Sequence, residues 1–321
     1  MAWLLAGLGL VILLLAGDSL VKGAVNLALR LGVSPLIVSL TIVAFGTSAP
    51  ELLISIEAVL YGSPGIALGN VVGSNTANIL LVLGVPAMIR TLHTSTCDSR
   101  SSYLMMLAAS VLFIAMCFAG PLTWAHGTVL LLGLVAMLSH SFMAAKQHRM
   151  ASLSAAAASP TKEEDDVEGA DPTMPRWQIW AFLILGLIGL PLGASLLVDN
   201  AVIIARDFGV SETVIGLTLV ALGTSLPELA TTLVAALRGK ADVALGNVIG
   251  SNMFNLLAII GIASFFGPIQ VGPEFLYFDL WVMLGASLLI IPFVFFGRDI
   301  NRLAGGVLTV LYLIYVVSLI T

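Results

Sequence analysis

Long apolar runs, separated by short polar or Gly/Pro-containing connections, follow one another along almost the whole chain. Runs of ~20 residues or more are typical of helices that cross a lipid bilayer. We expect ten spans, at residues 2–29, 35–60, 65–88, 102–119, 124–145, 177–205, 212–237, 241–266, 277–297 and 302–320. The pattern therefore predicts an all-α polytopic membrane protein.

The composition supports this interpretation. Of 321 residues, 59% are hydrophobic and 10% are charged, and the mean hydropathy is +1.07. Ordinary soluble domains have about 25% charged residues, so a soluble globular protein is excluded. No basic patch with interleaved aromatic residues is present, and we expect the lipid bilayer, not nucleic acid, as the surrounding partner.

One connection is much longer than the others. Residues 146–176 contain an Ala/Ser tract followed by a strongly acidic run at 162–168. Such a composition cannot bury a hydrophobic core. We therefore expect a disordered linker at 146–176 between a first five-span half, 1–145, and a second five-span half, 177–321.

The distribution of Lys and Arg predicts the orientation. If both termini lie outside the cell, Arg206 is the basic loop residue left outside. The cytoplasmic connections then hold Arg30, Arg90, Arg100, Arg238, Lys240, Arg298, Arg302 and the basic residues of the linker. Excess Lys and Arg mark cytoplasmic loops, so we expect a multi-pass protein of the cell membrane with the acidic linker in the cytoplasm.

The sequence repeats itself at an offset of 177 residues. The block GTSAPE at 46–51 aligns with GTSLPE at 223–228, and GNVVGSN at 69–75 aligns with GNVIGSN at 246–252. Because each half holds an odd number of expected spans, the second copy enters the membrane upside down. Inverted repeats are typical of secondary transporters, whose substrate sites lie near the bilayer midplane where the repeats meet.

Two acidic residues, Glu51 and Glu228, occupy equivalent positions inside expected spans. Placing a carboxylate at the centre of a membrane helix costs about 2.5–3.5 kcal/mol on the insertion scale. The alternative to a functional role is that each glutamate pairs with a neighbouring hydroxyl and only holds helices together. A duplicated carboxylate beside a helix-breaking proline favours function.

The neighbouring residues offer further oxygen ligands. Pro50 has no N–H, which frees the Gly46 carbonyl, and Thr47 and Ser48 share a helix face with Glu51. The second copy repeats this arrangement with Gly223, Thr224, Ser225 and Pro227, and each adjacent span adds a Ser and an Asn at i, i+4 spacing, namely Ser74 with Asn78 and Ser251 with Asn255.

This ligand set suits hard cations. Calcium takes ~6–8 oxygens in flexible geometry, and the kinked faces contain no His or Cys for zinc or copper. Two carboxylates neutralise one calcium ion or two sodium ions equally well. Competition for one shared site, which is the basis of exchange, follows from that charge balance.

At these residues the sequence resembles the cation/calcium exchanger superfamily, whose signature is two inverted repeats with G-T-S-x-P-E and G-N-x-x-G-S-N. With its short central linker it is similar to the prokaryotic sodium/calcium exchangers. The resemblance covers most of the chain. It implies ten helices in two inverted repeats with ion sites at the kinked spans 2, 3, 7 and 8, and a secondary antiporter, not an enzyme, that exchanges sodium for calcium without a cofactor.

The resemblance also implies residue roles. Calcium would be bound by Glu51, Glu228, Thr47 and Thr224. Sodium sites would use these residues together with the Ala44 carbonyl, Ser48 and Ser74 on one side and the Ala221 carbonyl, Ser225 and Ser251 on the other. Asn78 and Asn255 would close the middle of the cluster.

Several alternatives stay open at this point. Many family members have Asp at the position of Asn255, so the fixed charge here is limited to two carboxylates. Coupling to protons or potassium in the same fold, or transport of another hard divalent cation such as manganese, is the main alternative. An intramembrane enzyme is disfavoured, because neither a His-based metal motif nor a G-x-S-x-G elbow is present. We expect the protein to function as a monomer.

Charged residues also occur in the first and sixth expected spans. Asp18 and Lys22 are spaced i, i+4, and Lys22 aligns with Asp199 in the repeat. We expect Asp18 and Lys22 to form a neutralising pair, with a sliding contact between the two spans as the alternative.

Overall fold

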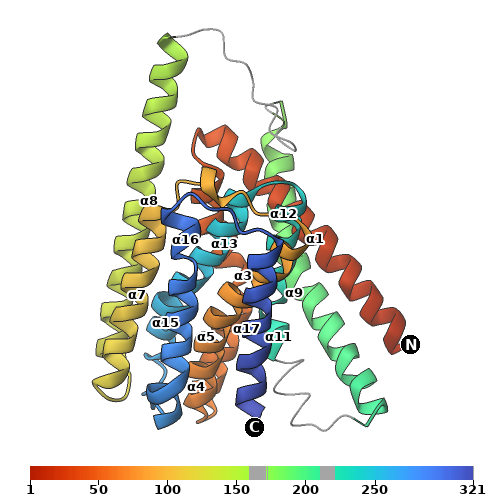
Figure 1. Cartoon of the computed structure of the whole chain (residues 1–321), viewed down its shortest axis with the longest axis vertical. Coiled ribbons are helices and arrows are strands. Elements are labelled where there is room, and N and C mark those ends of the chain that lie inside the picture. Colours follow the sequence, from red (N-terminus) through yellow and green to blue (C-terminus); the bar gives the residue numbers. More distant parts are fainter. Residues whose placement is uncertain (159–170, 172, 210–220, 321) are drawn as a thin grey trace.

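The apolar runs form helices whose bounds lie close to the expected spans. The computed structural model describes residues 1–158, 171, 173–209 and 221–320 of the chain (Figure 1). In the first half the elements are α1 Ala2–Leu31, α2 Pro35–Val38, η1 Ser39–Val43, α3 Ala44–Thr47, α4 Ala49–Leu60, α5 Pro64–Ala77, η2 Asn78–Val82, α6 Gly84–Ile89, η3 Thr94–Thr96, α7 Arg100–Phe118 and α8 Trp124–Ala158.

The described part of the second half is also helical. Its described elements are α9 Arg176–Asp207, α11 Ala221–Thr224, α12 Leu226–Leu237, α13 Ala241–Met253, η5 Phe254–Ile259, α14 Ile260–Ala263, η6 Phe275–Asp279, α15 Leu280–Leu289, α16 Ile291–Phe295 and α17 Arg302–Ile320. The described regular structure is all helical apart from two isolated β-bridges, which join Leu92 to Ile300 and Leu122 to Ile269.

Length and hydropathy identify these helices as membrane spans. Within the described residues, 8 helices are long and apolar enough to cross a bilayer, and a bent pair raises this number to 9. The expected span at 212–237 falls partly on residues 210–220, which lie outside the described part, and its described end is the short apolar helix Leu226–Leu237. The all-helical polytopic class is confirmed, while the count of ten spans stays a prediction.

The bent pair breaks where the sequence places a proline. Pro35–Thr47 and Ala49–Leu60 meet at an angle of 43°. Ser48, at the break, has φ −88° and ψ 6°, and Pro50 lies in the first turn of α4. Ser225 has nearly the same backbone, φ −86° and ψ 1°, with Pro227 in the first turn of α12. Proline fits the first turn of a helix because the N–H that it lacks has no helical acceptor there.

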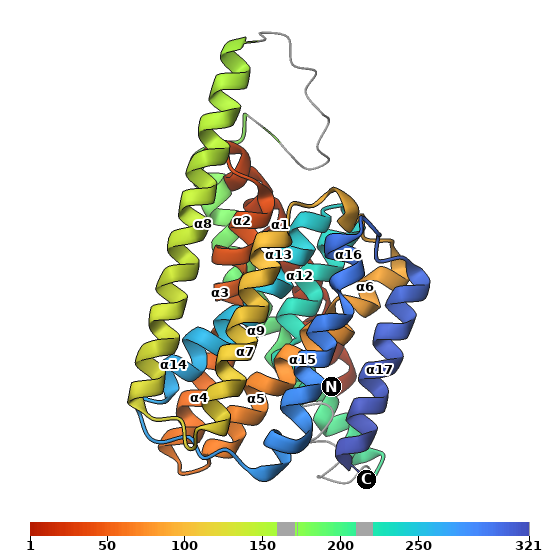
Figure 2. The same ribbon diagram turned by 60° about the vertical axis from the view of Figure 1, so that its left-hand side comes forward.

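The expected linker at 146–176 is wrong in its first part. Helix α8 continues to Ala158 and projects beyond the rest of the bundle (Figure 2), so residues 146–158 are helical. This segment is rich in alanine, the residue with the highest intrinsic helix propensity, and it extends a helix that has already formed. The acidic run at 162–168 lies outside the described residues.

Helices α1 and α9 lie side by side along most of their length (Figure 1). Small residues allow this close approach: a Cβ at Gly9 would be 2.6 Å from the Leu197 nitrogen, and a Cβ at Gly186 would be 2.6 Å from the Leu20 Cβ. Glycine contacts of this kind are typical of helix pairs in membranes.

The expected pair of Asp18 with Lys22 is wrong. The Asp18 carboxylate instead accepts a hydrogen bond from Arg238 Nε at 2.7 Å, which ties α1 to the end of α12. Lys22 Nζ lies 4.6 Å from the centre of the Phe182 ring on α9. A planar guanidinium binds a carboxylate with better geometry than an ammonium four residues away on the same helix.

The span formed by α13, η5 and α14 lies at the centre of the bundle, because its most apolar stretch of residues is 100% buried. At the periphery, α17 packs on α6 (Figure 2) through two glycines. A Cβ at Gly305 would be 2.6 Å from the Gly84 oxygen and 2.8 Å from the Met88 nitrogen. A Cβ at the next residue, Gly306, would have no neighbouring atom within 4 Å in the described structure.

We therefore expect Gly305→Ala to destabilise the protein by about 1–3 kcal/mol, because backbone atoms of α6 must move to admit the methyl group. Gly306→Ala is the matched control, and it should leave stability unchanged or raise it by up to about 1 kcal/mol through helix propensity. Thermal unfolding of the two purified variants in detergent checks this. Equal melting temperatures for the two variants would contradict the described packing.

Candidate functional site

The candidate site residues gather where helices break or change their winding. Glu51 and Glu228 lie in the first turns of α4 and α12, directly after the two breaks. Asn78 begins η2, a π-helical turn, and Asn255 lies in η5, another π-helical turn. Such turns release backbone groups from regular helical pairing and occur frequently at functional sites.

The two carboxylates are buried and close to each other. Glu51 and Glu228 are each 1% exposed. Ser48 Oγ donates to Glu228 Oε1 at 3.3 Å. In the described part of the chain, Oε2 of each glutamate has no hydrogen-bond partner, and neither glutamate takes part in an ion pair.

Hydroxyl groups from both halves meet beside these carboxylates. Thr47 Oγ1 lies 3.3 Å from Asn247 Oδ1 and 3.4 Å from Ser251 Oγ. Ser48, the neighbour of Thr47, donates to the Glu228 carboxylate. Side chains about 200 positions apart in the sequence therefore meet beside Glu228.

Four asparagines form a reciprocal network between the halves. Asn75 Nδ2 donates to the Asn252 carbonyl at 3.2 Å, and Asn252 Nδ2 donates to the Asn75 carbonyl at 3.3 Å. Asn78 Nδ2 donates to Asn252 Oδ1 at 3.0 Å, and Asn255 Nδ2 donates to Asn75 Oδ1 at 3.0 Å. The side-chain oxygens of Asn78 and Asn255 are buried and have no partner among the described residues. Asn78 and Asn255 thus each use a side-chain donor for a bond to the other half, and their side-chain oxygens remain available as ligands.

Two further asparagines, which the sequence analysis did not assign to the site, hold the glutamates in place. Asn70 Nδ2 donates to the Glu51 carbonyl and to Ser55 Oγ, both at 3.1 Å. Asn247 Nδ2 donates to the Glu228 carbonyl at 3.3 Å and to Thr232 Oγ1 at 3.2 Å. The signal for them was present, because both residues belong to the duplicated G-N-x-x-G-S-N blocks.

The remaining expected ligands differ in whether they already have hydrogen-bond partners. Ser225 Oγ is buried and has no partner among the described residues, and Ser74 on α5 is buried as well. The Ala44 carbonyl accepts from the Ser48 nitrogen at 3.1 Å and from Thr47 Oγ1 at 3.3 Å, so it is engaged within its own helix. The Ala221 side chain lies outside the described part of the structure.

Thr224 lines a small cavity of about 200 Å³ that adjoins the breaks from the side of α9. Pro50 and Pro227 line the same cavity, as do Ser195 and Asp199. Asp199 accepts from Ser195 Oγ at 3.1 Å and takes no part in the ion pair of Asp18. This cavity brings an acidic side chain of α9 to the edge of the site.

A helical membrane protein with a buried, duplicated cluster of oxygen ligands belongs to the class of secondary cation transporters. The chain is a member of the sodium/calcium exchanger protein family, whose model matches residues 1–143 and 178–321. The resemblance drawn from the repeated blocks is thereby confirmed.

Individual relatives cover nearly the whole chain. It is 38% identical over 310 residues to the "Putative antiporter CaxA" of Alkalimonas amylolytica, which spans 96% of this chain and 95% of that protein. It is 33% identical to the "Sodium/calcium exchanger MaX1" of Methanosarcina acetivorans over an aligned length of 342 residues. The alignment covers 97% of this chain and 96% of that protein. The solved structure of the sodium-calcium exchanger NCX_Mj soaked with 2.5 mM Na⁺ and 1 mM Sr²⁺ is similar with a TM-score of 0.81 at 32% identity, covering 98% of this chain and 97% of that one.

The asparagine network predicts a specific pattern of energetic coupling. Asn75→Ala leaves the Asn255 donor unpaired and Asn255→Ala leaves the Asn75 acceptor unpaired, so each single variant should lose about 1–3 kcal/mol of stability. The double variant removes both groups and should lose less than the sum, by about 0.5–3 kcal/mol. Thermal unfolding at a fixed calcium concentration measures the cycle.

The control cycle pairs Asn75 with Asn70, which lies on the same helix α5 and shares no partner with it: Asn75 donates to Asn252, whereas Asn70 donates to Glu51 and Ser55. We expect the effects of these two substitutions to add. Coupling in the control cycle, with additivity between Asn75 and Asn255, would contradict the hydrogen bonds that cross between the halves.

Proposed function

We propose that the chain is a secondary antiporter that exchanges sodium for calcium across the cell membrane by alternating access. One observation carries this proposal: five buried oxygens without a hydrogen-bond partner among the described residues lie at the helix breaks and at the π-helical turns. They belong to Glu51, Glu228, Asn78, Asn255 and Ser225. An unpartnered polar group in the interior costs about 1–3 kcal/mol and a charged one costs more, so a bound cation explains their arrangement.

The chemistry of the ligands supports hard cations as the substrates. Carboxylate, amide and hydroxyl oxygens are the ligands that calcium prefers. In the described part of the chain, no three His, Cys, Asp or Glu side chains gather into a metal site, so the charge of the cluster is that of the two glutamates. One calcium ion or two sodium ions would neutralise it, and the two ions would therefore compete.

We assign the individual ligands accordingly. Calcium is bound between Glu51 and Glu228 with help from Thr47 and Thr224. Sodium ions use the same glutamates and threonines together with Ser48, Ser74, Ser225, Ser251 and the carbonyls of Ala44 and Ala221, and Asn78 and Asn255 face the middle. The engaged Ala44 carbonyl would have to exchange a helical hydrogen bond for the ion. These ligands hold the transported ions themselves, and we propose that the exchange uses no cofactor.

An inverted repeat gives this site two equivalent exits. We propose ten spans in two five-helix halves, 1–145 and 177–321, related by the offset of 177. Contacts that recur at this offset support the proposal, since Asn70 holds Glu51 as Asn247 holds Glu228. Rocking of one group of helices against the other would expose the fixed site to each side in turn. The protein would act as a monomer with both termini outside.

Two observations favour sodium as the driving ion. The hydroxyl pairs Thr47-Ser48 and Thr224-Ser225 occur in both copies of the repeat, and the relatives MaX1 and NCX_Mj are named as sodium/calcium exchangers. Potassium is the second candidate. The chain is 26% identical over 152 residues, 44% of its length, to the mouse "Sodium/potassium/calcium exchanger 4".

We expect Glu51→Gln and Glu228→Gln each to abolish sodium-dependent calcium uptake into proteoliposomes, because an amide removes one of the two charges that neutralise calcium. Glu57→Gln is the matched control, since Glu57 is an exposed carboxylate on the same helix α4. Uptake should persist in this control. Undiminished flux in either site variant would refute the assignment.

The driving ion is identified by imposing one gradient at a time on proteoliposomes that contain the wild-type chain. We expect an outward sodium gradient to drive calcium uptake, while a proton or potassium gradient of the same size leaves calcium at its background level. Uptake driven by protons or potassium in the absence of sodium would establish the alternative coupling instead.

A further inference from the structure

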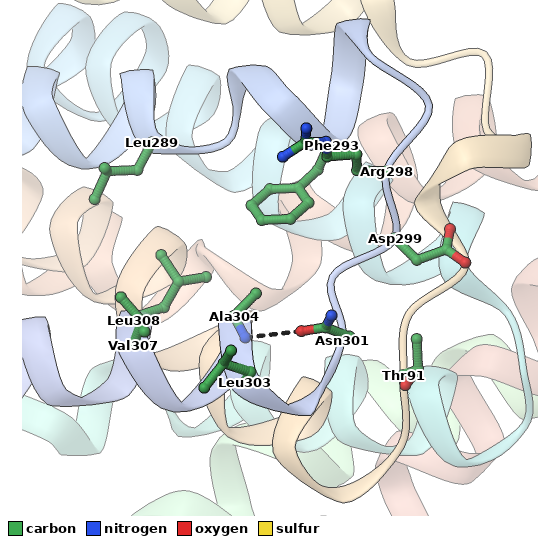
Figure 3. Close-up of a pocket in the computed structure, with 10 residues that line it drawn as sticks. All are labelled: Thr91, Leu289, Phe293, Arg298, Asp299, Asn301, Leu303, Ala304, Val307 and Leu308. Carbon is green, nitrogen blue, oxygen red and sulfur yellow. Dashed lines mark hydrogen bonds between the residues drawn. The ribbon is translucent and has the colours of Figure 1, made fainter.

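Helix α17 leaves a groove beside the helix pair that precedes it in the sequence. Its glycine face packs on α6, as described above, and it also contacts η2. Between α17 and the pair α15 and α16 lies a cavity of about 680 Å³ (Figure 3). This cavity separates α17 from the two helices before it.

The walls of this groove are apolar. Leu289 and Phe293 line it on the side of α15 and α16, and Leu303, Val307 and Leu308 line it on the side of α17. Leu303 is 78% exposed and Val307 is 52% exposed. Because these helices are membrane spans, this surface faces hydrocarbon and not water.

One end of the groove is polar. Arg298, Asp299, Thr91 and Asn301 line it there (Figure 3). The Arg298 side chain is exposed and forms no ion pair or hydrogen bond with any residue that the structure describes. Asn301 Oδ1 accepts from the Ala304 nitrogen at 2.9 Å, which leaves its Nδ2 as a donor.

The acidic neighbour Asp299 forms no ion pair with Arg298. The Asp299 carboxylate lies 2.8 Å from His93 Nδ1 and accepts from the Ser95 nitrogen at 3.0 Å. In Figure 3 the side chains of Arg298 and Asp299 leave the loop in opposite directions. The rim of the groove thus presents a free guanidinium together with hydroxyl and amide donors.

We propose that this groove binds a phospholipid with an anionic head group. An apolar trough with an unpaired guanidinium at its rim matches a molecule with an acyl chain and a phosphate. Basic pockets between transmembrane helices on the cytoplasmic side bind anionic head groups, and Arg298 lies at the end of the bundle where most basic loop residues gather. The lipid phosphate contacts Arg298, and an acyl chain lies along Val307 and Leu289. This site is independent of which cations the chain exchanges.

The test titrates the purified, delipidated full chain with lipids and follows binding by native mass spectrometry. Phosphatidylglycerol should bind more tightly than phosphatidylethanolamine with the same acyl chains. Arg298→Gln should weaken phosphatidylglycerol binding by about fivefold, the factor that corresponds to one basic residue near the head group. Arg302→Gln is the control: it removes the same charge at the same end, and this side chain donates to the Ile89 carbonyl instead of lining the groove.

A second pair of variants tests the apolar part. Val307→Trp fills the groove and should lower binding of both lipids, whereas Leu313→Trp, at an exposed position of α17 outside the groove, should not. The melting temperature of each variant without lipid verifies that it is folded.

Three results would overturn the proposal. Equal weakening by Arg298→Gln and Arg302→Gln would indicate a diffuse surface charge. Unchanged binding in Val307→Trp would place the acyl chain elsewhere. Displacement of the lipid by millimolar inorganic phosphate would indicate a site for a soluble anion.

Discussion

Two carboxylates buried side by side within a membrane-spanning bundle are the constraint on which the rest of the structure depends. Glu51 and Glu228 are almost fully shielded from solvent, and no basic side chain of the described residues pairs with either. Charges in such surroundings need compensation, because desolvation of an ion costs several kcal/mol. The helix breaks, the hydroxyl groups and the proposed cation all compensate these charges. The compensation is needed because long apolar helices surround the two carboxylates.

Some asparagines hold the site in place, and others offer oxygens to a bound ion. Asn70 and Asn247 fix the backbone at the two glutamates, and Asn75 and Asn252 join the halves through each other's carbonyls. Amides suit this role because each one offers donors and an acceptor at once without adding charge. Asn78 and Asn255 donate to this scaffold as well, and their neutral side-chain oxygens are left without a partner among the described residues. The proposed site can therefore have many ligands and still balance one calcium ion or two sodium ions.

Much of this could be read from the sequence, and what could not has physical causes. Helix bounds followed from apolar length, and the breaks followed from Pro50 and Pro227, because both features act locally. The hydrogen bonds between Asn75 and Asn252 join residues 177 positions apart, and no local pattern specifies them. The partner of Asp18 was missed for a related reason: i, i+4 spacing suggested Lys22, whereas tertiary packing brings Arg238 within 2.7 Å. The helical continuation of α8 was missed because low hydrophobicity was interpreted as disorder although the segment is rich in alanine.

The central claim is that a calcium ion bridges Glu51 and Glu228 and is displaced there by sodium. Anomalous diffraction from crystals grown with calcium tests it most directly. The account predicts one strong peak between the two carboxylates, about 2.3–2.6 Å from their oxygens, which fades when the crystals are moved into sodium. A calcium peak bound elsewhere in the chain, or a peak between the glutamates that sodium leaves unchanged, would contradict it.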